Sequence, residues 1–158
     1  GSTDNTHEII KKIVGQYFGK VRGIRHRRNF GKTEAIKTGL DHAQGKILML
    51  FDTDLETHPD EDIPVFMAAI KKGADVVSGY RQGRSDGKVL TSKIYNFVSN
   101  KLFGMALHDM NWMKAFKREC IEFIELRGDW HRFILMMLHS AGFKIAEEPV
   151  NWYPRKYG

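Results

Sequence analysis

The sequence predicts an α/β domain built on a mostly parallel sheet with helices on both faces. Helical and strand patterns alternate along the chain, which is typical of this class. The segment 46–51, KILMLF, is continuously apolar, as expected of a central strand that is covered on both faces. The 158 residues fit one domain, so we expect a single domain over 1–158 with ligands at the carboxyl ends of its strands.

The first half of the chain begins with a helix that Ser2, Thr3 or Asp4 can cap, and whose apolar residues include Ile9 and Ile13 at helical spacing. The segment 59–73 has acids in its first turn, lysines in its last and a glycine behind it, an arrangement that the helix dipole favours. Further elements expected here are strands at 21–26, 46–51 and 74–80 and helices at 32–45 and 59–73.

The second half begins with a polar, basic, glycine-containing loop over 82–92. The elements expected after it are helices at about 92–103, 116–126 and 131–141 and a strand over 143–152. Repeats and low-complexity segments are absent from the sequence, so nothing divides it into smaller units.

Composition limits the class of protein and of partner. Hydrophobic content of 42% and charged content of 28% are ordinary for a globular protein, and the apolar runs are shorter than the roughly 18 residues that span a bilayer. The single Cys120 excludes an internal disulfide and favours a reducing compartment. A net charge of +6 suggests an anionic partner: nucleic acid, a phosphorylated small molecule or a membrane surface.

Two carboxylates, Asp52 and Asp54, directly follow the most hydrophobic strand. Carboxylates one residue apart at a strand end can converge on one hard cation, and Mg²⁺ or Mn²⁺ there would bridge to phosphate oxygens. The alternative is a solvated acidic turn that leads into the next helix, where Asp60 and Glu61 favour the helix dipole. Position alone leaves both interpretations open.

Basic residues gather in two places. The segment 20–32 holds six Lys and Arg residues but one aromatic, Phe30, whereas a nucleic-acid groove interleaves several aromatics with its charges. A second group lies near a helix start and suits anion binding; it comprises Arg81, Arg84, Lys88, Ser92 and Lys93. Asp129, His131 and Arg132 stand together beside an apolar helix pattern, which makes a purely structural role for His131 less favoured.

A series of motifs in one order gives the chain a resemblance to a known family. The series includes RNFGKTEAIKTGLDHAQGKILMLFDTDLETHPDEDIP, DVVSGYR, SKIYNFVSNKLFG, HDMNWMKAFKRE, GDWHRFI and EEPVNWYPRKYG. Together they resemble the family 2 glycosyltransferases of the polyprenyl-phosphate (dolichyl-phosphate) sugar synthase type over essentially the whole chain. GDWHRFI and the closing YPRKYG are the most specific; the Asp-x-Asp element alone is widespread.

The resemblance implies a GT-A, Rossmann-like nucleotide-diphospho-sugar transferase fold. It also implies a metal-dependent enzyme that moves a hexosyl or hexosaminyl group from a nucleotide-sugar donor to a polyprenyl-phosphate acceptor. Asp52 and Asp54 would hold Mg²⁺ or Mn²⁺ against the donor diphosphate, and Glu56 stands where the family usually has Gln. The implied donor-binding residues are Asp4, Asn29, Lys32 and Asp52.

The resemblance also assigns the acceptor side and the chemistry. Arg81, Arg84 and Ser92 would bind the acceptor phosphate. That phosphate is already an anion and can attack without a strong base, which would invert the anomeric configuration. The implied catalytic residues are Asp54, Asp129, His131 and Arg132, with Asp129 as a base if the acceptor is a hydroxyl. We expect peripheral contact with a membrane surface, a cytoplasmic location at the inner face of that membrane, and no nucleic-acid partner.

Two other interpretations stay open: a basic nucleic-acid-binding module, and an inactive GT-A-like fragment with a structural or interaction role. The chain begins at a helix cap, whereas the family places a strand and an Asp-Asp pair before that helix. We therefore expect the catalytic domain over 1–158 to be N-terminally incomplete. The loop between Arg81 and Ser92 is also short for the family.

Overall fold

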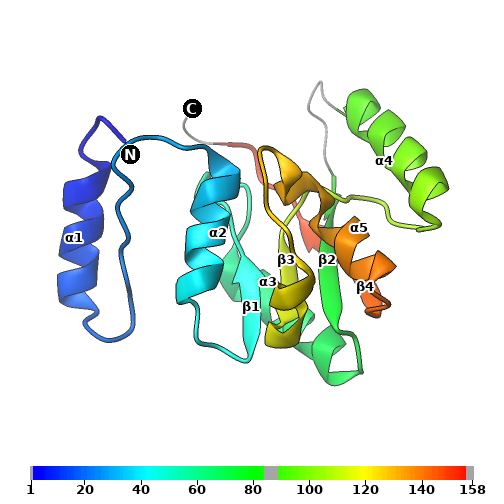
Figure 1. Ribbon diagram of the computed structural model, residues 1–158, viewed down its shortest axis with the longest axis horizontal. Helices are drawn as coiled ribbons and strands as arrows, with labels where there is room; N and C mark the ends of the chain where they lie inside the picture. The colour runs from blue at the N-terminus through cyan, green and yellow to red at the C-terminus, as the bar shows by residue number, and fades with distance from the viewer. Residues whose placement is uncertain (1, 84–88, 156–158) are drawn as a thin grey trace.

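The computed structural model describes residues 2–83 and 89–155, and its centre is a four-stranded sheet of order β1-β3-β2-β4 (Figure 1). The strands are β1 (Ile47–Leu50), β2 (Val76–Gln82), β3 (Lys114–Lys117) and β4 (Ile145–Asn151). The α-helices are α1 (Thr6–Gln16), α2 (Lys32–His42), α3 (Pro59–Lys71), α4 (Val89–Phe103) and α5 (Ile134–Ser140). Two 3₁₀-helices, η1 (Arg118–Phe123) and η2 (Trp130–Phe133), lie between β3 and α5.

The sheet is mixed rather than mostly parallel. β2 and β4 pair in parallel from Val76 opposite Ile145 onward, but β3 pairs antiparallel with both β1 and β2. β1, β2 and β4 therefore run in one direction, and β3 is inserted between β1 and β2 in the other. The predicted α/β class with helices on both faces is confirmed, whereas the predicted predominance of parallel pairing is wrong.

This error arises because strand β3 was not predicted. The sequence predicts a helix at 116–126 in its place. In the structure β3 ends at Lys117 and a 3₁₀-helix takes over at Arg118. Lys114, Ala115 and Phe116 are all buried, as in a strand with neighbours on both sides. The lysines at its two ends give the segment a polar pattern that resembles one face of a helix.

The predicted strand at 21–26 is also wrong. This segment is extended but pairs with no strand among the described residues, and it runs back along α1. A Cβ added at Gly23 would lie 2.7 Å from Ile10 Cγ2 and 3.1 Å from Val14 Cγ2, so the chain passes close to the helix. An extended segment becomes a strand only where a neighbouring edge offers it hydrogen bonds.

The core has two halves, one on each face of the sheet. On one face Leu48, Val76 and Phe116 pack with α2 and α5. On the other face Val77 and Ala115 pack with α3. The helices cover both faces, and the carboxyl ends of β1 and β2 come to one edge together with the start of β3 (Figure 1).

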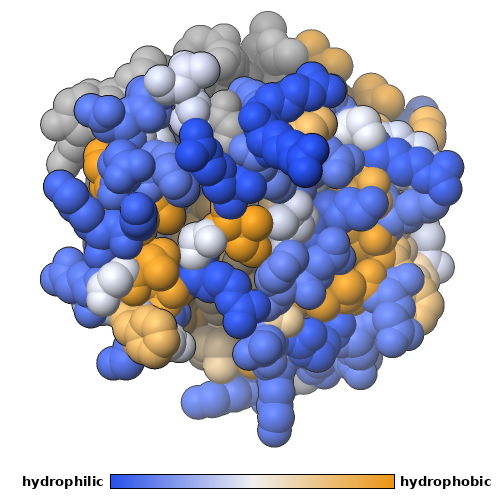
Figure 2. All heavy atoms as spheres, turned by 60° about the vertical axis from the view of Figure 1, so that its left-hand side comes forward, coloured by the Kyte–Doolittle hydropathy of each residue, from blue (hydrophilic) through white to orange (hydrophobic). Residues whose placement is uncertain are grey.

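Helices α1 and α4 lie at opposite ends of the molecule (Figure 1). Both expose apolar side chains: Ile9 of α1 is 56% exposed, and Phe97 and Leu102 of α4 are 68% and 73% exposed. On the side where α1 comes forward, apolar residues reach the surface in separate patches (Figure 2). In the described part of the chain, no helix is both long and apolar enough to cross a membrane.

Candidate functional site

A pocket of about 730 Å³ opens at the sheet edge predicted to bind ligands. Its walls come from α2, the end of β1, the start of β3 and η2. Its polar lining is mainly basic, with Lys32, Lys114 and Arg132 set against Asp52. The remaining lining residues are Ala35, Ile36, Gly39, Leu40, Ala43, Leu48, Met49, Leu50, Phe51, Thr57, Asn111, Trp112, Met113 and His131.

The acidic loop after β1 turns sharply. Leu55 has φ 63, in the left-handed region that non-glycine residues seldom occupy. The turn lets the backbone N–H of Glu56 donate to Asp54 Oδ1 at 3.3 Å. Strained backbone of this kind is common at functional sites, and here it fixes the position of Asp54.

Each of the two acids faces a basic side chain. Lys32 Nζ donates to Asp52 Oδ2 at 2.6 Å, and Arg155 donates to Asp54 Oδ2 at 2.9 Å and lies 3.4 Å from Glu56. The Lys32 and Asp52 side chains are 50% and 45% exposed, so their ion pair stabilises the fold by only about 0–1 kcal/mol. Asp52 is therefore accessible and weakly held, whereas Asp54 is half-buried, with its side chain 24% exposed.

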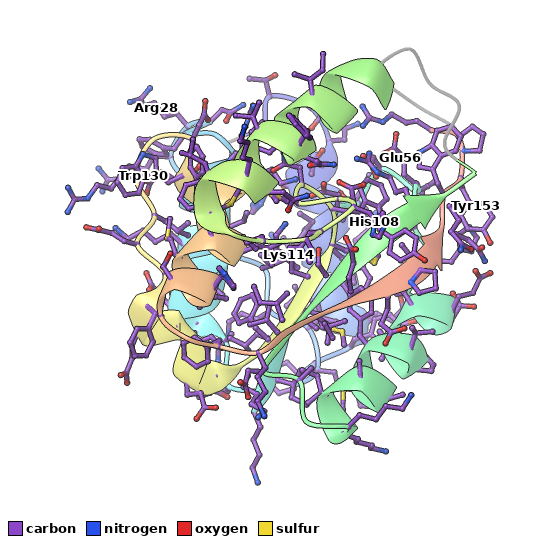
Figure 3. All side chains as sticks on the ribbon, turned by 90° about the vertical axis from the view of Figure 1, so that its right-hand side faces the viewer. Arg28, Glu56, His108, Lys114, Trp130 and Tyr153 are labelled. Carbon is purple, nitrogen blue, oxygen red and sulfur yellow. The ribbon has the colours of Figure 1, made fainter. Side chains whose placement is uncertain are left out.

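The segment after β4 brings Arg155 to the acids. The backbone N–H of Tyr153 donates to the Glu56 carbonyl at 3.2 Å, and the Tyr153 hydroxyl donates to Glu61 at 2.9 Å. Figure 3 shows Glu56 and Tyr153 near one edge of the molecule. Hydrogen bonds from Asn151 and then Tyr153 hold the pKa of Glu61 below its usual value. The described start of the closing motif, residues 153–155, thus forms part of this edge.

His131 reaches the pocket from η2. Its Nδ1 is hydrogen-bonded to Thr33 Oγ1, near the start of α2, at 2.7 Å. Burial, together with the charges of Lys32 and Arg132, lowers the pKa of His131, so the ring is neutral at pH 7. Asp129 precedes η2, is exposed, and lies outside the residues that line the pocket.

Lys114 is the innermost polar group of the pocket. Its side chain is 5% exposed, and its Nζ donates to the Trp112 carbonyl at 2.7 Å. Burial lowers the pKa of Lys114 from 10.5 to about 8, partly offset by the charge of Asp109. In Figure 3 Lys114 lies on β3 in the middle of the molecule, whereas Arg28 and Trp130 lie at its outer edge.

Arg81 is engaged within the fold. Its Nε donates to Asp109 Oδ2 at 2.6 Å, both side chains are 10% exposed, and the guanidinium lies 4.4 Å from the centre of the Trp112 ring. Arg81 therefore anchors the loop before β3. Arg84 lies outside the described residues; Ser92 belongs to α4, and its side chain lies outside the described part.

The remaining predicted donor residues lie on the other side of α2. Asn29 lines a second pocket of about 340 Å³ whose other residues include Arg28, Phe30 and Ser2. Asp4 lies just before α1 and accepts a hydrogen bond from the backbone N–H of Thr6 at 3.0 Å; hydrogen bonds with the Thr6 side chain and then with its backbone lower the pKa of Asp4. The two pockets share Ala35 and Gly39 of α2.

The structure thus brings together Lys32, Asp52, His131 and Arg132 around one pocket, whereas Asp54, two residues beyond Asp52, lies outside the residues that line it. Sequence reasoning missed Lys114, Trp112 and Arg155. All three lie in the motifs HDMNWMKAFKRE and YPRKYG, but the sequence of these motifs does not distinguish a residue that lines a pocket from one in the core.

A divalent cation fits the acidic loop by the chemistry of its ligands. Asp52, which is exposed, and Asp54, which is half-buried, offer carboxylate oxygens, which Mg²⁺ and Mn²⁺ prefer. Over residues 2–83 and 89–155 no group of three or more His, Cys, Asp or Glu side chains forms a complete metal cage. Two carboxylates suit a metal whose other ligands come from a phosphate-containing substrate.

Known structures with a similar fold are glycosyltransferases. A glucosyl-3-phosphoglycerate synthase from Mycobacterium tuberculosis, solved with Mg²⁺ and uridine diphosphate, has a TM-score of 0.69 and 21% identity; the match covers 100% of this chain and 58% of that one. The same enzyme solved with Mn²⁺ and UDP-glucose also has a TM-score of 0.68 and 21% identity. The predicted GT-A fold is therefore confirmed.

Curated relatives act on polyprenyl phosphates, by their names. A dodecaprenyl-phosphate galacturonate synthase of Rhizobium johnstonii is 31% identical over 100% of this chain and 48% of its own length. An undecaprenyl-phosphate 4-deoxy-4-formamido-L-arabinose transferase of Salmonella paratyphi B is 30% identical over 100% and 49%. The chain spans about half the length of these relatives. The family described as glycosyl transferase family 2 matches residues 1–140, and on that match the chain belongs to this family.

Proposed function

We propose that this chain is the catalytic domain of a metal-dependent, inverting glycosyltransferase that moves a sugar from a nucleotide-sugar donor to a polyprenyl phosphate. The observation that carries the proposal is the pair Asp52 and Asp54 in the loop after β1, where Asp52 lines a pocket together with Lys32, Lys114 and Arg132. The polyprenyl-phosphate substrates named for the relatives support the acceptor class.

The donor diphosphate would lie beside the acidic loop. Asp52 and Asp54 would hold Mg²⁺ or Mn²⁺, which when bound neutralises charge on the leaving diphosphate. Lys32 already faces Asp52 at 2.6 Å and can turn to a phosphate oxygen once a cation takes its place. The second pocket, with Asn29, Arg28 and Phe30, would then receive the nucleoside.

The acceptor supplies the nucleophile. One oxygen of its phosphate attacks the anomeric carbon as the bond to the donor diphosphate breaks, and the nucleoside diphosphate leaves with the electron pair. Neutral His131, held by Thr33, and Arg132 would line the pocket near the transferred sugar. Arg81, Arg84 and Ser92 stay predicted ligands of the acceptor phosphate, and Asp129, exposed outside the pocket, stays the predicted base for a hydroxyl acceptor.

Contact with the inner face of a membrane forms part of the proposal. Ile94, Phe97, Val98 and Leu102 recur at helical spacing on α4 and are 51–73% exposed. An exposed apolar stripe of this kind suits the lipid boundary where a polyprenyl phosphate resides. It supports peripheral contact by a helix that lies on the surface.

A transfer assay tests the proposal. The purified chain is incubated with a panel of nucleotide sugars, a polyprenyl phosphate and MnCl₂ or MgCl₂, and glycolipid formation is measured. Asp54→Asn should abolish Mn²⁺-dependent donor binding with an unchanged circular dichroism spectrum, because it removes a ligand charge at an exposed loop. Asp41→Asn, an exposed acid of α2, is the matched control. Undiminished Mn²⁺-dependent binding of nucleotide sugar by Asp54→Asn would refute the metal assignment.

Binding measurements on the same purified chain test the two alternative interpretations, a nucleic-acid-binding module and an inactive fragment. A nucleic-acid-binding module would bind nucleic acid with an affinity that falls steeply with salt. An inactive GT-A-like fragment would show neither donor binding nor transfer under any metal condition.

A further inference from the structure

We propose that Lys114 binds a phosphoryl oxygen of the reacting substrates, so that it is a further substrate-binding residue of this pocket. The inference rests on the proposed function, which supplies two phosphate groups: the donor diphosphate and the acceptor phosphate. Both offer the same chemistry to an ammonium group, and the experiment below distinguishes them.

The position of Lys114 follows from the direction of β3. Because β3 runs antiparallel to its neighbours, its first residue lies at the same edge as the carboxyl ends of β1 and β2. Lys114 pairs with Leu50 on one side and Ser78 on the other. Leu50 is two residues before Asp52, so the lysine lies on the strand next to the acidic loop.

The ammonium group of Lys114 has hydrogen-bonding capacity to spare. It can donate three hydrogen bonds, and among the described residues it donates to the Trp112 carbonyl. The negative charges of Asp109 and Asp52 act on Lys114, but both acids already have partners. Asp109 is paired with Arg81 and Asp52 with Lys32, each at 2.6 Å. A buried lysine without a carboxylate of its own is costly unless a ligand completes its surroundings.

The surroundings select an anion as that ligand. Lys114 lines the pocket together with Lys32 and Arg132, and the one acid of that lining is Asp52. A purely structural lysine would instead extend to the surface or contact a carboxylate, as Lys117 of the same strand does with Asp75 at 2.6 Å.

Binding measurements on the full 158-residue chain test this assignment. Lys114→Met keeps the length and apolar volume of the side chain and removes the charge. Lys37→Met, which removes the same charge from an exposed position on α2, is the control. Calorimetry measures the affinity of each protein for UDP or GDP with MnCl₂, and separately for farnesyl phosphate. Circular dichroism and thermal unfolding verify that each variant is folded.

Loss of a hydrogen bond to a charged group should weaken the affected ligand by about tenfold or more in Lys114→Met, with Lys37→Met unchanged. Weaker nucleoside diphosphate binding places Lys114 at the donor, and weaker farnesyl phosphate binding places it at the acceptor. Lys114→Arg should restore part of the affinity. A folded Lys114→Met that binds both ligands within twofold of wild type overturns the assignment. If wild type binds neither ligand, the proposed function falls, and this assignment with it.

Discussion

The buried Lys114 should destabilise the fold at neutral pH, and Lys114→Met should relieve that cost. Desolvation is the main reason why the pKa of Lys114 falls from 10.5 to about 8. A difference of roughly 2.5 pKa units, at about 1.4 kcal/mol per unit, corresponds to about 3 kcal/mol. Methionine fills a similar volume without a charge, so we expect the free energy of unfolding to rise by up to about 3 kcal/mol at pH 7.

The effect should depend on pH in a defined direction. The pKa of this amine is lower in the folded than in the unfolded chain, so the unfolded chain binds more protons between pH 8 and 10.5. The cost is therefore complete below about pH 8, shrinks as pH rises through that range, and vanishes above it. The advantage of Lys114→Met over wild type should follow the same course.

Urea denaturation of wild type, Lys114→Met and Lys37→Met at several values between pH 6 and about 10 measures this difference. Lys37 is exposed, so its replacement should change the free energy of unfolding by less than about 0.5 kcal/mol. An advantage of Lys114→Met that stays constant from pH 7 to about 10 would refute the argument, since it would arise from packing and not from a buried charge.

Three further outcomes are expected. Gly79→Ala should destabilise the fold by about 1–3 kcal/mol, because its Cβ would lie 3.0 Å from Phe66 Cζ and 3.1 Å from both Met113 Cγ and Val150 Cγ2; chemical denaturation measures this, and an unchanged stability would contradict the close packing. Arg81→Met should cost about 3–5 kcal/mol, since it leaves the buried Asp109 charge unpaired; adding Asp109→Asn should recover part of that loss, and failure to do so would mean that the ion pair is not the cause. His131 should titrate below its ordinary value of 6.5 in an NMR pH series, because burial and nearby cations oppose its protonation; a midpoint above 6.5 would contradict the buried position.

Local patterns in the sequence were sufficient to predict most of the helices and three of the strands. The helix α3 shows why: Pro59 stands at its first turn, acids follow, and Gly73 with φ 105 ends it. Each of these signals acts within a few residues, so the sequence carries them directly. Asp52 lines the pocket at the carboxyl end of β1, as expected from its place after that strand, and Lys32, which the family resemblance assigned to the donor, lines the same pocket.

The misses share a physical cause: the decisive partner is far along the chain. The local sequence around Lys114 is typical of a surface position, and only the pairing of β3 with β1 and β2 buries this residue. The segment 21–26 has the local pattern of a strand, but among the described residues no strand pairs with it. The partner of Arg81 was likewise missed: its Nε donates to Asp109 at 2.6 Å, 28 residues later in the chain. Hydrophobic periodicity reports on burial and not on which strand lies next to which, so these contacts could not be derived from it.

The antiparallel strand β3 also acts as a spacer between β1 and β2. Neighbouring strands lie about 4.8 Å apart, so the insertion of β3 separates Leu50, at the end of β1, from Ser78 of β2 by about 10 Å, with Lys114 between them. The ladder on each side of Lys114 therefore sets the distance between the start of the acidic loop and β2. If the proposed donor lies at the acidic loop and the proposed acceptor lies beside β2, the backbone fixes the span over which they meet, and changes in the loops can alter what is bound without altering that span.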